Sequence, residues 1–416
     1  MASPAFVPRH MHSHLMQCAK SFPAIAIVGP RQSGKSSLVR MAFPKHQIVV
    51  LESPDIAAAA RNDPRGFLAS FKAGTGAILD EVQRVPELLS YLLEIIDDNP
   101  VPGRWILTGS ESFLLSEKVS QSLAGRVAML ELLPMTHAEI ALFPGKKSAA
   151  KKSLNTAIFA GGYPAIFARK IDPTLWISAY LATYVERDVR NVLRLGDLST
   201  FQRFLGLCAG RTSQLINASA LAGDAGISQP TAKAWLSVLE ATFIVKLLPA
   251  WHGNVRKRIV KAQKLHFIDT GLACHLLGIR SADQLQTHPL RGALFESWTV
   301  SEIMKLQAST GERGQLFHWR DQNGAEVDLV IARGDMMVAI EMKSGMTFHS
   351  EWLRGLNRFA AAQPAQSTLR RAVVYGGNAP WIGDSAEGVS WSDLKLFADR
   401  IFKVGAQIKI LKKTRA

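Results

Sequence analysis

The residues with the clearest chemistry form the stretch GPRQSGKSS at positions 29–37, between a short apolar run and an amphipathic segment. The stretch has the form G-x-x-x-x-G-K-S, whose glycines let the backbone turn tightly around phosphate groups. The lysine of such a loop reaches the outer phosphates, and the serine holds Mg²⁺. We therefore expect ATP and Mg²⁺ as cofactors. The predicted binding residues are Gly29, Pro30, Arg31, Gln32, Ser33, Gly34, Lys35, Ser36 and Ser37.

A second chemical pattern is the apolar run GAILDEV at residues 76–82, which ends in two acids. In phosphate-binding-loop enzymes, such a strand carries the carboxylate that is associated with the metal ion. We expect Asp80 to hold the Mg²⁺ together with Ser36, and Glu81 to activate the attacking water. A plain pair of acids at the end of a strand is the alternative, which the loop upstream disfavours.

A third pattern combines acids and a lysine in the C-terminal part of the chain. Side chains two apart on a strand point to the same face, so Glu341 and Lys343 of VAIEMKSG (338–345) would share one face. A hairpin through residues 333–335 would bring Asp328 alongside them, and a segment of helical periodicity carries Glu296. The result is an E…D…E-x-K set. A solvated salt bridge on an edge strand explains an isolated E-x-K equally well.

The elements that position the first two patterns alternate between strand-like and helical segments. Strand-like runs at 24–29, 47–53, 76–82, 104–110 and 127–134 are separated by segments long enough for crossover helices, which predicts a parallel sheet with helices on both faces. We expect the strand of Thr108 and Ser110 to lie between the loop strand and the acid strand, which would put one of these two hydroxyls near the γ-phosphate. We choose Ser110 for that role. Arg126 is our candidate for stabilising transition-state charge. The alternatives are that Ser110 is an ordinary polar residue at the end of a strand and that Arg126 is an ordinary surface arginine.

The middle of the chain predicts a winged helix-turn-helix over residues 218–251 and the strand-like run that follows. Ser228 would cap the second helix, whose apolar positions repeat at helical spacing. Non-specific contact with DNA and docking between the two ends of the chain are both open. The inward-facing positions would be Ala232, Trp235, Leu236 and Leu239. The phosphate contacts would come from Arg256, Lys257, Arg258, Lys261 and Lys264, and the base contacts from Gln229, Thr231 and Lys233.

Composition sets the class of protein. The 416 residues are 47% hydrophobic and 20% charged, as in soluble globular proteins, and no apolar run has the roughly 18–20 residues needed to cross a membrane. The start of the chain has no features of a signal or transit peptide, so we expect a cytoplasmic protein without membrane contact. Three separated cysteines predict reduced, structural thiols.

The net charge of +15 is unevenly distributed along the chain. Residues 1–134 hold 13 basic and 12 acidic side chains, so the excess lies in the remainder. A basic excess in one part of a chain indicates a polyanionic partner, most simply nucleic acid. A generally basic surface is the alternative. The sequence is compatible with an oligomer and indicates no particular protein partner.

Four segments, GPRQSGKSS, ILDEVQRVPEL, WILTGSESFLL and SLAGRVAMLELLPMTHAEI, together resemble one family. It comprises the bacterial and archaeal AAA-type ATPases whose P-loop domain precedes a domain of unknown function, DUF4143. The resemblance continues through GGYPAIF, YVERDVRNV, KRIVKAQKLHFIDTGLACHLLG, GALFESWTVSEI and EVDLVI, and so covers nearly the whole chain.

The C-terminal acids and lysine also resemble the PD-(D/E)xK nuclease core, an αβββαβ fold. This resemblance implies that Asp328 and Glu341 bind a metal ion, that Glu296 completes the site, and that Lys343 is the catalytic lysine. The first motif departs from the pattern because Asp328 follows Glu326 and Val327 rather than a proline.

The expected fold is α/β. We predict a AAA-type P-loop domain at 1–150, a helical and winged-helix segment at 151–289, and a nuclease-like α/β domain at 290–416, with residues 151–416 together resembling DUF4143. The expected function is Mg²⁺-dependent ATP hydrolysis in association with nucleic acid. The alternative is an ATP-dependent switch that binds DNA or a protein partner without cutting.

Overall fold

The computed structural model describes residues 6–72, 74–109, 125–144, 153–184, 198–252, 262–312, 315–364 and 368–402. Of the residues singled out above, Ser110, Arg256, Lys257, Arg258 and Lys261 lie outside these ranges, as does most of YVERDVRNV.

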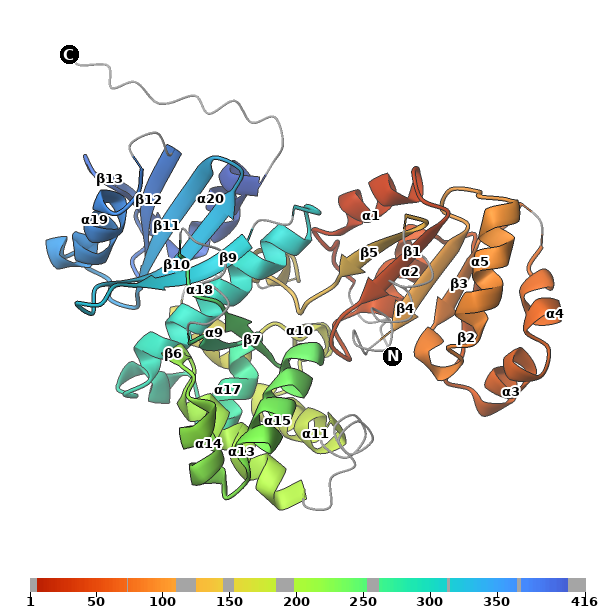
Figure 1. The fold of residues 1–416 in the computed structure, drawn as a ribbon, viewed down its shortest axis with the longest axis horizontal. Coiled ribbons are helices and arrows are strands. Elements are labelled where there is room, and N and C mark those ends of the chain that lie inside the picture. Colours follow the sequence, from red (N-terminus) through yellow and green to blue (C-terminus); the bar gives the residue numbers. More distant parts are fainter. Residues whose placement is uncertain are drawn as a thin grey trace, which may run out of the picture.

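The N-terminal part contains the predicted parallel sheet (Figure 1). Its order is β2-β3-β4-β1-β5, so the strand of Thr108 lies between the loop strand and the acid strand, as predicted. Every described pair of neighbouring strands in it is parallel. The strands are β1 (Ala24–Val28), β2 (Gln47–Val50), β3 (Ala77–Asp80), β4 (Trp105–Gly109) and β5 (Val127–Glu131).

Helices cover both faces of this sheet. Ala24, Ala26 and Val28 pack among residues of α3, α4 and α5, whereas Ile25 and Ile27 pack against α1 and α2. Because both faces are covered, β1 is apolar along its whole length instead of alternating. The elements are α1 (His12–Ala19), α2 (Lys35–Ala42), α3 (Pro54–Asn62), α4 (Pro64–Ala69), η1 (Val82–Arg84), α5 (Leu88–Asp98) and α7 (His137–Ile140).

The middle part contains the predicted helix-turn-helix. Helix α14 ends at Gly226, whose φ of +71° suits glycine, and the Ser228 hydroxyl caps α15 by accepting from Thr231 N at 3.2 Å. Ala232, Trp235, Leu236 and Leu239 are buried, as predicted. The elements are α9 (Leu154–Ala160), α10 (Pro164–Ala168), α11 (Pro173–Tyr184), α13 (Leu198–Gly210), β6 (Gln214–Leu215), α14 (Ala218–Ala225), α15 (Gln229–Ala241), β7 (Val245–Leu248), β8 (Lys264–Phe267), α17 (Thr270–Leu276) and η3 (Asp283–Gln286).

The C-terminal part begins with α18 (Arg291–Ala308) and contains a mixed sheet of order β13-β14-β12-β11-β10-β9. The αβββαβ order is confirmed: three antiparallel strands follow α18, and β12 pairs in parallel with β11 after α19. The elements are β9 (Gln315–Arg320), β10 (Glu326–Arg333), β11 (Met336–Lys343), η4 (Ser350–Leu353), α19 (Arg354–Ala361), β12 (Thr368–Tyr375), β13 (Trp381–Ile382), β14 (Glu387–Ser390), η5 (Trp391–Asp393) and α20 (Leu394–Phe402).

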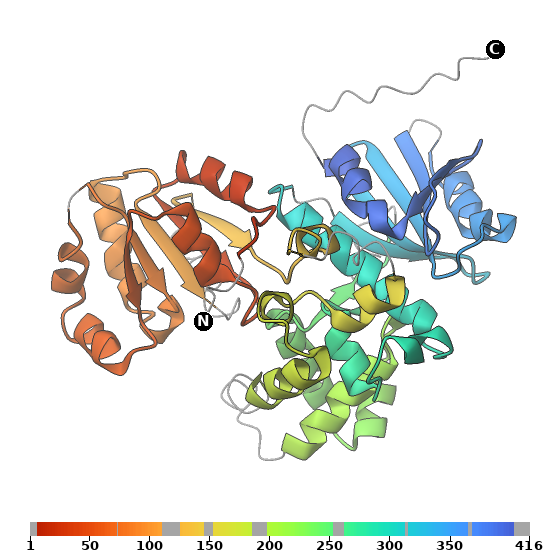
Figure 2. The same cartoon turned by 180° about the vertical axis from the view of Figure 1, so that it is seen from behind.

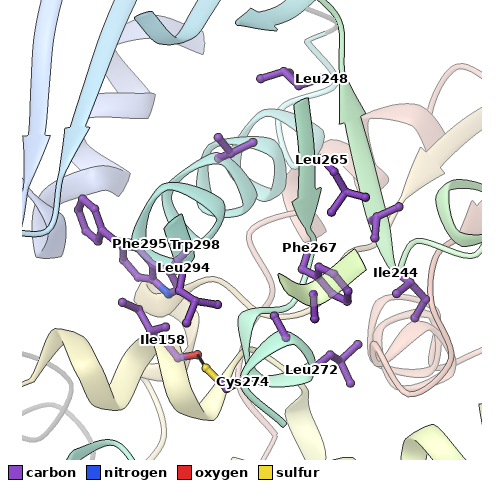
Figure 3. Close-up of a cluster of buried hydrophobic side chains, with 14 of the residues drawn as sticks. Ile158, Ile244, Leu248, Leu265, Phe267, Leu272, Cys274, Leu294, Phe295 and Trp298 are labelled. Atoms are coloured by element: carbon purple, nitrogen blue, oxygen red, sulfur yellow. Dashed lines mark hydrogen bonds between the residues drawn. The ribbon is translucent and has the colours of Figure 1, made fainter. Parts of the chain in front are cut away.

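The middle and C-terminal parts share one hydrophobic core. A single cluster of buried side chains runs from Leu154 on α9 to Phe402 on α20. Figure 3 shows its centre, where Phe267 of β8 and Leu272 of α17 lie near Phe295 and Trp298 of α18. These two parts therefore pack as one unit, while the N-terminal sheet lies to one side of it (Figures 1 and 2).

No helix among the described ranges is long and apolar enough to cross a membrane.

Candidate functional site

The predicted phosphate-binding loop connects β1 to α2 at the carboxyl edge of the parallel sheet. Gly29 and Gly34 have φ values of +151° and +96°, which residues other than glycine rarely adopt. A Cβ at Gly29 would lie 2.2 Å from the carbonyl oxygen of Leu132. Glycine is therefore required where the loop passes the chain that follows β5.

The loop lysine is held inside the loop. Lys35 is 5% exposed, and its Nζ donates to the carbonyl oxygens of Gly29 and Pro30, both at 2.9 Å. Lys35 is also the first residue of α2, whose N-terminal N–H groups and dipole favour an anion. The Ser33 hydroxyl is buried and has no hydrogen-bond partner among the described residues, which leaves a donor for a bound group. These features fit a nucleotide phosphate.

The acid strand brings its carboxylate to the same loop. Ser36 Oγ donates to Asp80 Oδ1 at 3.0 Å, and Thr108 Oγ1 donates to the same oxygen from the neighbouring strand β4. Asp80 is 6% exposed and Thr108 is fully buried. A hydroxyl and a carboxylate are oxygen ligands of the kind that Mg²⁺ prefers, so these side chains fit a metal ion beside the phosphates.

Glu81 lies directly after this carboxylate. Its backbone is in the left-handed region, with a φ of +60°, and its Oε2 accepts from Gln83 Nε2 at 2.6 Å. The Glu81 N–H points to Thr108 Oγ1 at 3.4 Å. Thr108 thus contacts both acids, whereas the sequence analysis chose Ser110 on this strand, as a group near the γ-phosphate. The signal was available, because Thr108 is the polar residue inside an otherwise apolar strand.

The structure corrects the assignment of Arg126. This residue precedes Val127, which pairs with Ala24 at the start of β1, whereas the loop follows Val28. Four residues of strand span about 13 Å. The Arg126 guanidinium also pairs with Asp97 of α5, at 3.1 Å for its Nη2. Arg126 therefore lies at the opposite edge of the sheet, and its prediction as a group acting on this chain's own γ-phosphate is wrong.

Arg9 anchors the loop, and sequence reasoning missed it. Its Nη1 donates to Ser33 O at 2.7 Å, its Nη2 to Leu133 O at 2.8 Å, and its Nε to Glu139 Oε1 at 3.1 Å. Burial alone would raise the pKa of Glu139, but the charges of Arg9 and His10 hold that pKa below its ordinary value. No local pattern marks Arg9, since its partners lie up to 130 residues away.

The C-terminal acids also converge, around a lysine from the middle part. Lys264 Nζ lies 3.4 Å from Glu296 Oε2, 3.2 Å from Glu326 Oε1 and 3.2 Å from Asp328 Oδ1. The expected phosphate contact from Lys264 is therefore wrong, because this residue is the first of β8 and is only 3% exposed. Glu326 was also missed, although it lies two residues before Asp328 and so shares its face of β10.

The remaining pair of the predicted set lies on the neighbouring strand. Glu341 Oε1 is 2.6 Å from Lys343 Nζ, so the two side chains share a face as predicted. The β10–β11 register pairs Leu329 with Ile340, which sets Asp328 beside Glu341, and Asp328 Oδ2 accepts from Met342 N at 2.8 Å. Glu341 Oε2 is buried without a hydrogen-bond partner among the described residues.

The acids in this cluster are hard to ionise together. Burial, reinforced by the charge of Asp328, raises the pKa of Glu296 to about 7 and that of Glu341 to about 8. Burial alone would lower the pKa of Lys264, but Asp328, Glu296 and Glu326 raise it. Lys264 is therefore a cation at neutral pH.

The predicted metal ligands of the nuclease-like part are thus engaged with lysines. Within the described ranges, no group of three or more His, Cys, Asp or Glu side chains is arranged to hold a metal ion. The three carboxylates around Lys264 instead face an ammonium, and Glu341 faces another. The set Glu296, Asp328 and Glu341 does not fit a magnesium ion as it stands.

Helix α18 links this cluster to the N-terminal part. Beyond Glu296, the same helix carries Glu302, whose Oε2 accepts from His137 N at 2.8 Å, and Lys305, whose Nζ donates to Met135 O at 3.2 Å. Glu302 and Lys305 also pair with each other at 3.0 Å, and both are buried. We call the contact made by these four residues the α18 joint. It consists of Met135, His137, Glu302 and Lys305.

A cavity of about 1310 Å³ lies between β5 and the middle and C-terminal parts. Its lining includes Met129, Phe243, Lys246, Met304 and Phe317, but no residue of the loop or of the carboxylate cluster. Neither candidate site therefore opens into it.

Family models match most of the chain. Residues 21–141 match the AAA domain, residues 151–283 a domain of unknown function (DUF8612), and residues 291–391 a domain of unknown function (DUF4143). Two uncharacterised proteins, from Mycobacterium bovis and Mycobacterium tuberculosis, are each 29% identical over 343 residues, which is 82% of this chain and 74% of theirs.

Two solved structures illustrate the structural likeness. The Walker-type ATPase of Pyrococcus abyssi is 15% identical, with a TM-score of 0.46, over 66% of this chain and 99% of its own. The Holliday junction branch migration motor RuvB of Thermotoga maritima is 17% identical, with a TM-score of 0.33, over 59% and 91%. Loop geometry and domain matches together show a AAA-type P-loop domain at residues 21–141, followed by DUF8612 and DUF4143 domains.

Proposed function

We propose that this protein binds ATP with Mg²⁺ and hydrolyses it. The observation that carries the proposal is the hydrogen-bonded set Ser36–Asp80–Thr108 beside a loop with the backbone of a phosphate-binding site. Loop N–H groups and Lys35 bind and orient the phosphates, and Ser36 and Asp80 hold the metal ion. When bound, Mg²⁺ neutralises charge on the phosphate oxygens.

Glu81 is the proposed base. Glu81 directly follows the proposed metal ligand Asp80, and Gln83 and Thr108 fix its side chain and backbone. Glu81 would orient the attacking water and accept its proton as the oxygen attacks the γ-phosphorus. Ser110 remains a predicted contact to the γ-phosphate.

Thr108→Val should lower ATP turnover about 10–100-fold while nucleotide binding persists, because outer partners of a metal-binding carboxylate have effects of this size. The measurement is steady-state phosphate release, with nucleotide affinity from a fluorescent ATP analogue. Thr75→Val is the matched control, since Thr75 precedes β3 at the opposite edge of the sheet. Equal turnover in both variants would argue against the role of Thr108, and absence of turnover in the wild type would refute the proposed activity.

We also propose nucleic acid, most simply duplex DNA bound without sequence preference, as the partner of the middle part. Two features support this: the basic excess after residue 134 and the winged-helix arrangement of α14, α15, β7 and β8. On α15, Gln229 and Lys233 are exposed, whereas the Thr231 hydroxyl bonds to Ser228 Oγ at 2.8 Å. This helix offers few groups for reading bases, so phosphate contacts should dominate.

DNA affinity should fall steeply with salt and change little with sequence. Lys233→Ala should reduce the slope of log affinity against log salt by about 1, as expected for the loss of one phosphate contact. Fluorescence anisotropy with two unrelated duplexes measures both quantities, and Lys45→Ala, an exposed lysine of the N-terminal part, is the control. Strong preference for one duplex, or no binding at low salt, would contradict the proposal.

Cleavage of nucleic acid is not part of the proposed function. The nuclease-like order of elements is present, but the carboxylates that would bind the metal ion are paired with lysines. The geometry favours the alternative considered from the sequence, in which the nucleotide state of the AAA domain alters what the rest of the chain binds.

A further inference from the structure

We propose that Lys264 is the resident cation of the C-terminal carboxylate cluster, where its ammonium takes the place of a divalent metal ion and locks the winged-helix sheet to the nuclease-like sheet. The cluster comprises Glu296, Glu326, Asp328 and Glu341.

The donor count supports this assignment. An ammonium group has three N–H donors and no acceptor. Lys264 Nζ lies within 3.4 Å of three different carboxylates, one on α18 and two on β10, so each donor has its own acceptor. Its side chain is 4% exposed and that of Asp328 is 3% exposed, so water offers little substitute.

Two of the carboxylates also accept hydrogen bonds from other groups. Glu296 Oε2 accepts from Ser213 Oγ as well as from Lys264, and Asp328 Oδ2 accepts from Met342 N at 2.8 Å while Oδ1 faces Lys264. Ser213 precedes β6 and Lys264 opens β8, and these strands pair with each other. The three-stranded sheet and the residue before β6 thus supply two of the groups that hold the acids.

A divalent ion does not fit beside this ammonium. Magnesium binds carboxylate oxygens at about 2.0–2.1 Å. The oxygens that it would need are those within 3.2–3.4 Å of Lys264 Nζ, so the two cations would lie close together in a buried site. Their repulsion is poorly screened there. Only one of them can occupy the cluster.

The fourth carboxylate of the cluster, Glu341, is only partly engaged. Glu341 is paired through Oε1 with Lys343, but its buried Oε2 has no hydrogen-bond partner among the described residues. If the Lys264 side chain were neutral and apolar, Glu341, Asp328 and Glu296 would present oxygens without their shared cation. Removing the ammonium should therefore create a divalent-cation site.

The test is Mn²⁺ binding by electron paramagnetic resonance, without nucleotide, in full-length protein carrying Asp80→Asn to remove the metal ligand of the AAA site. This Asp80→Asn protein, the parent of the variants below, should bind no Mn²⁺ at the cluster. Lys264→Met should gain one bound Mn²⁺ per chain, and adding Asp328→Asn should abolish that gain. Lys264→Arg keeps the cation and should behave as the parent.

A parent that binds one Mn²⁺ and loses it on Glu341→Gln or Asp328→Asn substitution would overturn the proposal. So would a folded Lys264→Met protein that gains no Mn²⁺. If Lys264→Met does not fold, the test compares the Asp80→Asn protein with and without Glu341→Gln. Identical Mn²⁺ binding by the two proteins supports the resident lysine. Loss of one bound ion on Glu341→Gln substitution contradicts it.

Discussion

Lys35→Ala should abolish measurable ATP turnover and weaken nucleotide binding. Lys35 is buried at the N-terminus of α2, where its ammonium is held 2.9 Å from two loop carbonyls. This is the site where we propose that the outer phosphates bind. Losing a charged donor aimed at the developing negative charge costs at least about 100-fold in rate. Alanine also leaves the carbonyls of Gly29 and Pro30 without their donor.

The comparison needs a matched lysine. Lys45→Ala removes the same charge from an exposed position just after α2 and should leave turnover unchanged. Lys35→Arg should also be impaired, because a planar guanidinium does not replace a compact ammonium in a tight loop. Turnover in Lys35→Ala that equals that of Lys45→Ala would mean that the loop is not the catalytic site.

Glu302→Ala should destabilise the protein by about 3–5 kcal/mol, because it leaves the buried ammonium of Lys305 without its carboxylate partner. The same change removes the acceptor of the His137 N–H in the α18 joint. The measurement is urea unfolding followed by tryptophan fluorescence, since Trp298 lies on the same helix and is nearly buried.

The control for this prediction is an exposed ion pair. Arg65 and Glu94 pair at 2.6 Å with side chains 70% and 53% exposed, so Glu94→Ala should cost about 0–1 kcal/mol. If Glu302→Ala costs no more than Glu94→Ala, the α18 joint does not hold the N-terminal part to the rest of the chain.

The nucleotide site followed closely from the sequence, for a physical reason. Phosphate binding depends on backbone shape, and Gly29 and Gly34 at fixed spacing specify that shape locally. The strand order and the position of Asp80 beside Ser36 then follow from the topology that such loops share. The helix-turn-helix was equally predictable, because caps and apolar periodicity are local signals.

What the sequence did not disclose depends on contacts between distant segments. Lys264 counted as one more basic residue next to a basic loop, and only the tertiary fold sets it beside Asp328, 64 residues later. Arg126 directly precedes the last strand of the sheet, and the parallel register sets it at the edge opposite the loop. Periodicity predicts which face a side chain occupies, and it does not predict which remote charge meets that face.

The central claim is tested most directly by phosphate release from ATP in the purified full-length protein, with Mg²⁺ and with excess EDTA, alongside Asp80→Asn. The account predicts turnover that requires Mg²⁺ and is lost in Asp80→Asn. No release under any of these conditions, or release that persists in Asp80→Asn and in EDTA, would contradict it.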